Sequence, residues 1–421
     1  MLILKSKLIK DCVRDGEDLD SSNSMKYLLS IKEAEPEPEP NLELELTQKN
    51  IEDKRFFFKN EDIDRNESND DDIILQRFLS NCLCETILLN DIPNTLDGIF
   101  MLENNNAWNE IFERFSGQLK NFDGSSLENL NALKLKSLFK IKKFDVCELF
   151  IKSSLKNLDQ NDDNFYINVF HWQILRIDMH LFLKNAEEAM HIMHSLPCII
   201  HDKDFYEKKM IIYVKVLIGS KKYKIAIKEL VKLLKNLELN NSFKLILYGH
   251  LIHLLIYTGL LKSAIYYSNQ FYEILYKINA FKKNLTYQYF LLCQALVLFT
   301  QDQYECAAVL YHLVISAFSN FDFEKNKDEK YLAMESILRT AVNNFCICCV
   351  HLKLINKAVK VFEQYIQSNP QNALSDTVVF NLCTIYDLKS SQLLSSKLKK
   401  VVYNITQIYH RNELEFKSFR I

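Results

Sequence analysis

Glycine is the residue that most constrains this chain, because only 7 of its 421 residues are glycine, whereas average usage is ~7%. Glycine supplies the positive φ of tight turns and lets the backbone approach phosphate groups. The patterns G-x-G-x-x-G and G-x-x-x-x-G-K-[ST], which mark dinucleotide and P-loop sites, do not occur. The scarcity of glycine therefore disfavours a nucleotide-binding sheet and a many-turned β-sandwich. Because proline is also scarce, at 6 residues, we expect a mostly helical protein.

Acidic residues are concentrated near the amino terminus. Residues 15–72 contain 19 acidic and 7 basic side chains, a net charge of −12, whereas the remaining residues carry a net charge of +10. Within this stretch the alternating prolines of residues 35–40 favour an extended polyproline backbone over a helix. We predict that residues 1–75 form a largely disordered acidic arm. Phe56-Phe57-Phe58 is the candidate anchor for a short linear motif in this arm.

From about residue 78 to about residue 409, apolar residues recur at spacings of three and four. Short clusters of Asn, Asp and Lys interrupt this pattern, for example at residues 104–106, 159–164 and 240–241. Helices separated by short breaks over more than 300 residues are typical of stacked helical hairpins. We therefore predict that residues 76–410 form one all-α array.

Small residues recur along this array, each a few residues after a short polar or basic turn. The best example is Ala358, with Phe362 four residues later, Pro370 beyond it and Cys346 twelve residues before it. Similar small positions, spaced 37 to 51 residues apart, are Ala107, Cys147, Ala189, Ala226, Ala264 and Ala307. The tetratricopeptide unit places a small residue where its two helices cross, with a period of about 34 residues. We predict a degenerate tetratricopeptide-like helical-hairpin solenoid, with its best repeat at 339–372 and carboxy-terminal capping helices at 374–410.

No cluster of residues predicts catalysis. The pairs His191/His194 and His250/His253 have no carboxylate or thiolate at ligand spacing, and closed zinc sites need four ligands. The motifs H-E-x-x-H, G-x-S-x-G and C-x-x-C are absent, and most of the 11 cysteines lie in apolar helical patterns. We therefore predict no enzymatic activity, no cofactor and no metal. The chain has no signal peptide or membrane-spanning pattern, which predicts a cytoplasmic protein with reduced cysteines.

Residues 203–244 are the most basic stretch, with 11 lysines against 4 acidic residues and no arginine. A solvated helix face explains this composition, and contact with an acidic partner, a phospholipid head group or nucleic acid is the alternative. Because arginine is preferred for bidentate phosphate recognition, we predict no nucleic-acid partner. The opposite charges also predict a weak, salt-sensitive contact between the acidic arm and this stretch. The candidate partner surface consists of Lys221, Lys222, Lys224, Lys228 and Lys232.

One carboxy-terminal motif is more specific than a generic repeat. Phe380-Asn381-Leu382 is followed by Thr384 and by Tyr386-Asp387-Leu388, shortly after Ala358, Phe362 and Pro370. This block resembles the end of the family of subunit twelve of the trafficking protein particle (TRAPP) complex. Residues 138–144 and 157–159, together with Tyr166, are similar to the first hairpin of that family.

The resemblance implies a non-catalytic subunit of a vesicle tether whose nucleotide-exchange chemistry belongs to other subunits. It implies that the partners are other TRAPP subunits and that the complex acts between endoplasmic reticulum and Golgi. Any membrane association would then be peripheral and through the complex. The alternative is a tetratricopeptide adaptor or co-chaperone in another assembly, for which Asn343-Asn344 is the candidate carboxylate clamp.

Overall fold

The computed structural model describes residues 71–82, 92–93, 95–104, 107–117, 124–156, 165–196, 203–235, 241–277, 285–318, 329–411 and 414–420. Every regular element within these ranges is a helix, and no strand occurs among them. This confirms the predicted all-α class. The helices are α4 (Asp71–Ser80), α5 (Leu96–Asn104), α6 (Trp108–Gly117), α7 (Gly124–Lys140), α8 (Phe144–Lys156), α9 (Phe165–Phe182), α10 (Ala186–Ser195), α11 (Lys203–Gly219), α12 (Tyr223–Leu234), α13 (Asn241–Tyr257), α14 (Leu261–Lys277), α15 (Leu285–Thr300), α16 (Tyr304–Phe318), α17 (Glu329–His351), α18 (Ile355–Ser368), α19 (Pro370–Ala373), α20 (Asp376–Lys389), α21 (Gln392–Ile408) and the 3-10 helix η4 (Phe416–Phe419).

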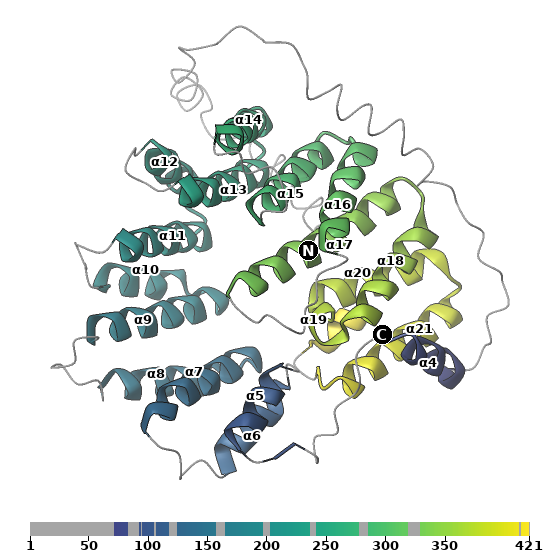
Figure 1. Cartoon of the computed structure of the whole chain (residues 1–421), viewed down its shortest axis with the longest axis horizontal. Coiled ribbons are helices and arrows are strands. Elements are labelled where there is room, and N and C mark those ends of the chain that lie inside the picture. Colours follow the sequence, from purple (N-terminus) through teal and green to yellow (C-terminus); the bar gives the residue numbers. More distant parts are fainter. Residues whose placement is uncertain are drawn as a thin grey trace, which may run out of the picture.

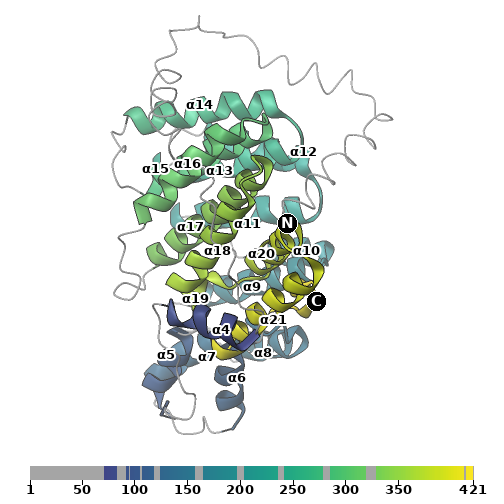
Figure 2. The same cartoon turned by 90° about the vertical axis from the view of Figure 1, so that its right-hand side faces the viewer.

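Consecutive helices pair into hairpins that follow one another around an arc (Figure 1). The arc runs from α5 and α6 through α9 to α12, then through α13 to α16, and ends in α18 to α21 (Figure 1). In the perpendicular view the arc is drawn out, with α14 near one end and α5 and α6 near the other (Figure 2). Each hairpin packs on the next, which is the arrangement of a helical solenoid.

Six of the described hairpins share one turn geometry. A single residue after the first helix adopts a left-handed φ of 59–78°. The N–H of the residue after it then donates to a carbonyl five residues earlier, over 2.8–3.0 Å, as in the Schellman ending of a helix. The left-handed residues are Lys142, Lys184, Lys221, Gly259, Asp302 and Lys353. The same short turn therefore reverses the chain in each of these hairpins.

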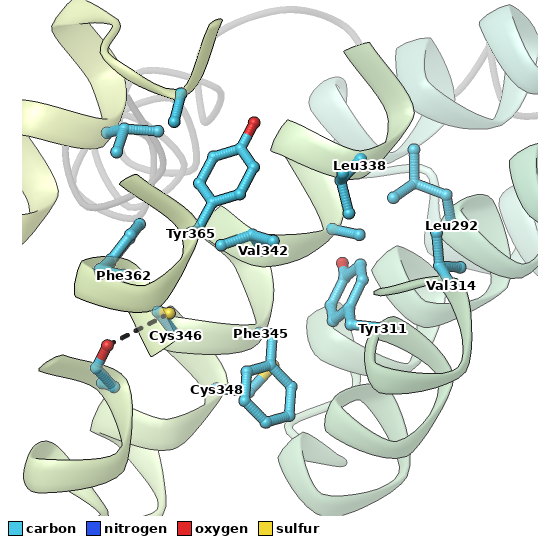
Figure 3. Packing of buried hydrophobic residues seen from close by; sticks show 14 of the residues in the cluster. Leu292, Tyr311, Val314, Leu338, Val342, Phe345, Cys346, Cys348, Phe362 and Tyr365 are labelled. Atoms are coloured by element: carbon cyan, nitrogen blue, oxygen red, sulfur yellow. Dashed lines mark hydrogen bonds between the residues drawn. The ribbon is translucent and has the colours of Figure 1, made fainter. Parts of the chain in front are cut away.

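A small, buried residue stands five positions after each of these left-handed residues. These side chains are 0% exposed, and they are Cys147, Ala189, Ala226, Ala264, Ala307 and Ala358. Cys346 of α17 lies against Ala358, with its thiol 3.5 Å from the Ala358 carbonyl oxygen (Figure 3). Phe362 is also fully buried on α18, and Pro370 begins α19 after the side chain of Asn369 caps that helix.

Aromatic residues next to the hairpin turns also join neighbouring hairpins. The first residue of a second helix meets the last residue of the next first helix in three aromatic pairs. Their ring centroids are 4.9 Å apart for Phe144–Phe182, 5.2 Å for Tyr223–Tyr257 and 4.2 Å for Tyr304–His351. These contacts fix the spacing of neighbouring hairpins in addition to the apolar core.

The apolar core is a series of clusters between successive hairpins. The largest cluster extends from α13 to α21 and includes Tyr311 and Phe362, both fully buried (Figure 3). Smaller clusters join α11 to α14, α9 to α11, and α7 to α9. At one interface polar groups replace an apolar contact, since the buried hydroxyl of Ser268 donates to the side-chain oxygen of Gln294.

Three boundaries differ from those expected from the sequence. Helix α4 begins at Asp71, inside the stretch assigned to the arm. Residues 1–70, including the Phe56-Phe57-Phe58 motif, lie outside the described residues. Helix α17 begins at Glu329, ten residues before the predicted repeat, and η4 follows the predicted capping helices. These differences arise because docking against distant helices, rather than local periodicity, sets where the elements begin and end.

Candidate interaction surfaces and the carboxy-terminal network

The family-like motif on α20 points into the molecule. Leu382 and Asn381 are 0% exposed and Tyr386 is 2% exposed. Asn381 donates to the side-chain oxygen of Asn343 over 2.7 Å, and Tyr386 donates to Glu363 over 2.7 Å. The motif therefore attaches α20 to α17 and α18, which is the role of a structural cap.

Asn343 and Asn344 cannot serve as a clamp in this structure. They are 6% and 5% exposed, and Asn343 donates to Asn344, which donates in turn to the hydroxyl of Tyr311. A carboxylate clamp needs these amides free in a groove. The structure instead uses them to satisfy one another in a chain of buried polar groups that ends at Asn381.

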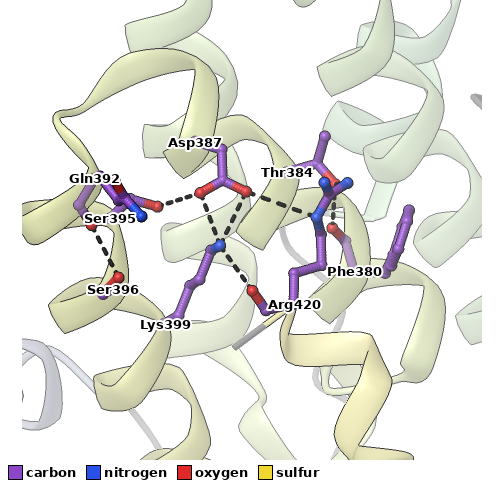
Figure 4. Close-up of polar contacts among 8 residues, drawn as sticks. All are labelled: Phe380, Thr384, Asp387, Gln392, Ser395, Ser396, Lys399 and Arg420. Carbon is purple, nitrogen blue, oxygen red and sulfur yellow. Dashed lines mark hydrogen bonds and ion pairs between the residues drawn. The ribbon is translucent and has the colours of Figure 1, made fainter.

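Asp387 is the centre of a polar cluster at the end of α20 (Figure 4). Its carboxylate accepts from Ser395 over 2.5 Å and pairs with Lys399 at 2.7 Å. Burial by itself would raise the pKa of Asp387, but the hydrogen bonds from Lys399 and Ser395 outweigh it and lower the pKa. Lys399 also donates to the carbonyl of Arg420 over 3.0 Å. The cluster therefore joins α20, α21 and the segment after η4.

Thr384 and Phe380 extend this cluster along α20. Arg420 donates to the Thr384 hydroxyl over 3.1 Å, and its guanidinium lies 5.3 Å from the centroid of the Phe380 ring (Figure 4). Thr384 donates in turn to the carbonyl of Phe380 over 2.7 Å. The exposed side of the motif is thus covered by the chain's own carboxy-terminal segment.

The first and last parts of the solenoid meet at the turn between α7 and α8. Lys142, the left-handed residue of that turn, pairs with Glu415 at 2.7 Å and lies 3.9 Å from Asp376. Asp376 in turn accepts from the Glu415 backbone N–H and from the Ser418 hydroxyl, over 2.9 and 2.8 Å. We call the two pairs Lys142–Glu415 and Lys142–Asp376 the closing ion pairs.

The surroundings of this junction shift the pKa values of two carboxyl groups in opposite directions. Hydrogen bonds from Lys142 and then Lys417 lower the pKa of Glu415 to about 2. Nearby, burial raises the pKa of Glu335 on α17, although the charges of Arg339, Arg411 and Lys140 act in the opposite direction. No local sequence signal marks these residues, because the partners are separated by up to 273 positions.

The predicted lysine surface lies on α12 and on the turn before it. Lys221 and Lys222 stand at the turn, and Lys224, Lys228 and Lys232 follow along the helix. All five side chains are exposed. The helix faces the core with Ala226, Leu230 and Leu233 instead. Lys224, Lys228 and Lys232 therefore share one face of α12, and Lys221 and Lys222 directly precede that helix.

The described residues contain no cluster suited to metal chemistry: among them, no three His, Cys, Asp or Glu side chains are grouped as a metal site would require. His253 has the thiol of Cys293 as a neighbour, 3.7 Å from its Nε2 atom. Burial raises the pKa of Cys147 to about 11 and those of Cys349 and Cys383 to about 12. These thiols are neutral core residues rather than nucleophiles.

None of the helices in the described ranges combines the length and the apolar character needed to cross a bilayer.

Comparison with known proteins finds similarity over a short segment of the chain. The chain is 32% identical over 66 residues to trafficking protein particle complex subunit 12 of Mus musculus, and 31% identical over 91 residues to the Homo sapiens protein. The matches cover 16% and 20% of this chain but only 8% and 12% of those relatives. No family model matches the chain.

Two solved structures resemble the chain at low scores. BtubC (BKLC) from P. vanneervenii has a TM-score of 0.38 and 13% identity, covering 57% of this chain and 90% of that one. A signal-transduction ATPase with a tetratricopeptide-repeat sensor, from Pyrococcus horikoshii, has a TM-score of 0.40 and 15% identity, covering 77% and 54%.

Proposed function

We propose that this chain is a non-catalytic scaffold subunit of a TRAPP-type vesicle-tethering complex. In this role it binds other TRAPP subunits and acts in transport between endoplasmic reticulum and Golgi. It is cytoplasmic and associates with early secretory and Golgi membranes peripherally, through the complex. The observation that carries the proposal is the identity of 31–32% to subunit 12 of human and mouse over 66–91 residues.

The architecture supports a scaffold. Stacked hairpins bury their small residues at the crossings and leave long outer and inner faces for partners. Several large apolar side chains also remain exposed and are available for contact with a partner. Leu175 and Phe182 on α9 are 38% and 52% exposed, and Leu388 and Leu393 near the α20–α21 turn are 55% and 71% exposed.

Affinity purification of the full-length tagged chain from its own cells, followed by mass spectrometry, tests this function. We expect TRAPP subunits to co-purify in constant proportion. A variant with Ala358→Phe, which disturbs the carboxy-terminal repeat, is expected to lose them. Lys360→Ala changes an exposed residue of the same helix and is the matched control.

Other partners would contradict the proposal. If the unmodified chain co-purifies with a chaperone or a cell-cycle assembly and not with TRAPP subunits, the adaptor alternative is correct. The buried state of Asn343 and Asn344 argues against the co-chaperone form of that alternative.

A further inference from the structure

The lysines of α12 form a continuous row. Residues four apart share one face of a helix, so Lys224, Lys228 and Lys232 are aligned. Lys235 continues the row at the end of the helix, and the two turn lysines precede it. The lysine stripe is defined here as the exposed set Lys221, Lys222, Lys224, Lys228, Lys232 and Lys235.

The stripe is almost unneutralised. Lys232 lies 4.0 Å from Glu229, and within the described part of the chain the other five lysines have no ion pair. Other lysines on first helices are paired, as Lys215 is with Asp178 at 2.6 Å and Lys136 with Glu103 at 2.6 Å. Like charges four residues apart repel one another, so the stripe attracts an anionic segment.

The same chain contains a segment of opposite charge. Residues 33–45 carry six glutamates and no basic residue, namely Glu33, Glu35, Glu37, Glu39, Glu43 and Glu45. This segment lies outside the described residues, which begin at Asp71 in α4. Because α4 packs against α21, the segment is connected to the body at a fixed point.

We propose that residues 33–45 bind the lysine stripe of the same chain. Alternating proline favours an extended backbone with ~3.1 Å per residue, so glutamates two apart are spaced ~6.2 Å along it. Lysines four apart on a helix are spaced ~6 Å, at 1.5 Å per residue. Because a polyproline helix has three residues per turn, these glutamates point to different sides of it, so the match with Lys224–Lys232 is in charge per unit length and not in a single facing row.

The linker between this segment and α4 limits how far the segment can reach. The 26 residues from Glu45 to Asp71 extend to ~90 Å at ~3.5 Å each. Binding of a tethered segment is intramolecular, so its effective concentration is set by the length of the linker and not by the protein concentration. An acidic partner of the stripe must then displace residues 33–45. This inference is independent of the proposed TRAPP function.

Carbodiimide cross-linking of the full-length chain tests the contact, because this reagent joins a carboxylate directly to an amine. We expect mass spectrometry to find links between Glu33–Glu45 and Lys224–Lys232 at about 0.01 M salt. The links should be lost at about 1 M salt, where the Debye length falls from ~30 Å to ~3 Å. Lys224, Lys228 and Lys232 changed to Glu should abolish them. The matched control changes Lys156, Lys360 and Lys389 to Glu and should retain them.

A second measurement separates docking from general charge effects. In the variant with the six glutamates changed to Gln, we expect acetylation of Lys224, Lys228 and Lys232 to become several-fold faster, while Lys156, Lys360 and Lys389 react at unchanged rates. Equal rates in both proteins would overturn the proposal.

Links spread evenly over all exposed lysines would also overturn it. So would links formed only between chains of different isotopic mass, which would indicate a second copy as the occupant. The proposal would also be overturned if the stripe lysines were protected from acetylation only when phosphatidylserine vesicles are added. That result would assign the stripe to a membrane surface.

Discussion

At the scale of single residues, the hairpin turns explain how a chain with 7 glycines can reverse direction so often. Among the six described turns of shared geometry, only Gly259 is a glycine, and Lys or Asp takes the left-handed position in the others. A side chain at positive φ costs about 1 kcal/mol or more relative to an unstrained conformation. The turn hydrogen bonds and the buried small residue five positions later offset this cost.

A first prediction concerns these left-handed positions. A Cβ atom added at Gly259 would meet nothing within 4 Å, so its cost is conformational alone. Gly259→Ala should destabilise the protein by about 1 kcal/mol. The reverse change, Lys184→Gly at φ 60°, should be stabilising by up to about 1 kcal/mol. Chemical denaturation of both variants measures the shift, and changes of the same sign in both would contradict this account.

A second prediction concerns the small residue at a helix crossing. Ala358 is 0% exposed, and the Cys346 thiol lies 3.5 Å from its carbonyl oxygen. Ala358→Phe adds volume where none is free and should destabilise the protein by about 1–3 kcal/mol. Thermal unfolding measures this, with Lys360→Ala as the control. An unchanged midpoint would mean that α17 and α18 do not cross at Ala358.

At the scale of elements, the cap on the carboxy-terminal end comes from the other end of the body. Helix α4 packs against α21, where Phe78 is 8% exposed and joins the largest core cluster. Without α4, the apolar side of α21 would face solvent. Terminal repeats of a solenoid need such a cover to remain soluble.

A third prediction follows for α4. Phe78→Ala removes its main buried side chain and should cost about 3–5 kcal/mol of docking energy. We expect hydrogen exchange to become faster in α4 and α21 while α9 and α10 are unaffected. Arg77→Ala changes the exposed neighbour and should leave exchange unchanged. Uniformly faster exchange throughout the chain would show that α4 is part of the global folding unit instead.

At the scale of the whole molecule, ion pairs add to the apolar docking of α4 on α21 in joining the first and last described parts of the chain. Lys142 of the first full hairpin pairs with Glu415, which follows the last one. The side chains of Lys142 and Glu415 are 31% and 34% exposed, so solvent and salt reach the pair. This junction is therefore weaker than the packed interfaces between neighbouring hairpins.

A fourth prediction is the pH dependence of this closure. The pKa of Glu415 falls from 4.5 to about 2 in the folded chain, chiefly through Lys142. Because the folded pKa is the lower one, the stabilisation is complete above pH 4.5 and is lost as the pH falls toward 2. Glu415→Gln should therefore destabilise the protein near neutral pH by less than about 1 kcal/mol, given the exposure of the pair.

The same variant should converge with the parent protein as the pH approaches 2, when unfolding is measured across the acid range. Glu305→Gln alters an exposed carboxylate on α16 and serves as the comparison. A stability difference for Glu415→Gln that stays constant with pH would show that the ion pair does not contribute.

The sequence by itself determined the class of fold and the positions of the hairpins. Scarce glycine and proline favoured helices, which are the regular elements throughout the described ranges, and the 3–4 spacing of apolar residues located them. The small residues could be found because a turn and the helix crossing after it lie within a few positions of each other. Ala226 and Ala307 are examples, since each follows its left-handed residue by five positions.

The tertiary structure decided which distant residues meet, because that depends on how successive hairpins stack around the arc. The pairing of Lys142 with Glu415, the docking of α4 on α21 and the burial of Asn343 and Asn344 join residues that are distant in the sequence. A small rotation per hairpin, summed over the whole array, places these groups together or apart. That sum is set by side-chain packing at every interface, and no local pattern records it.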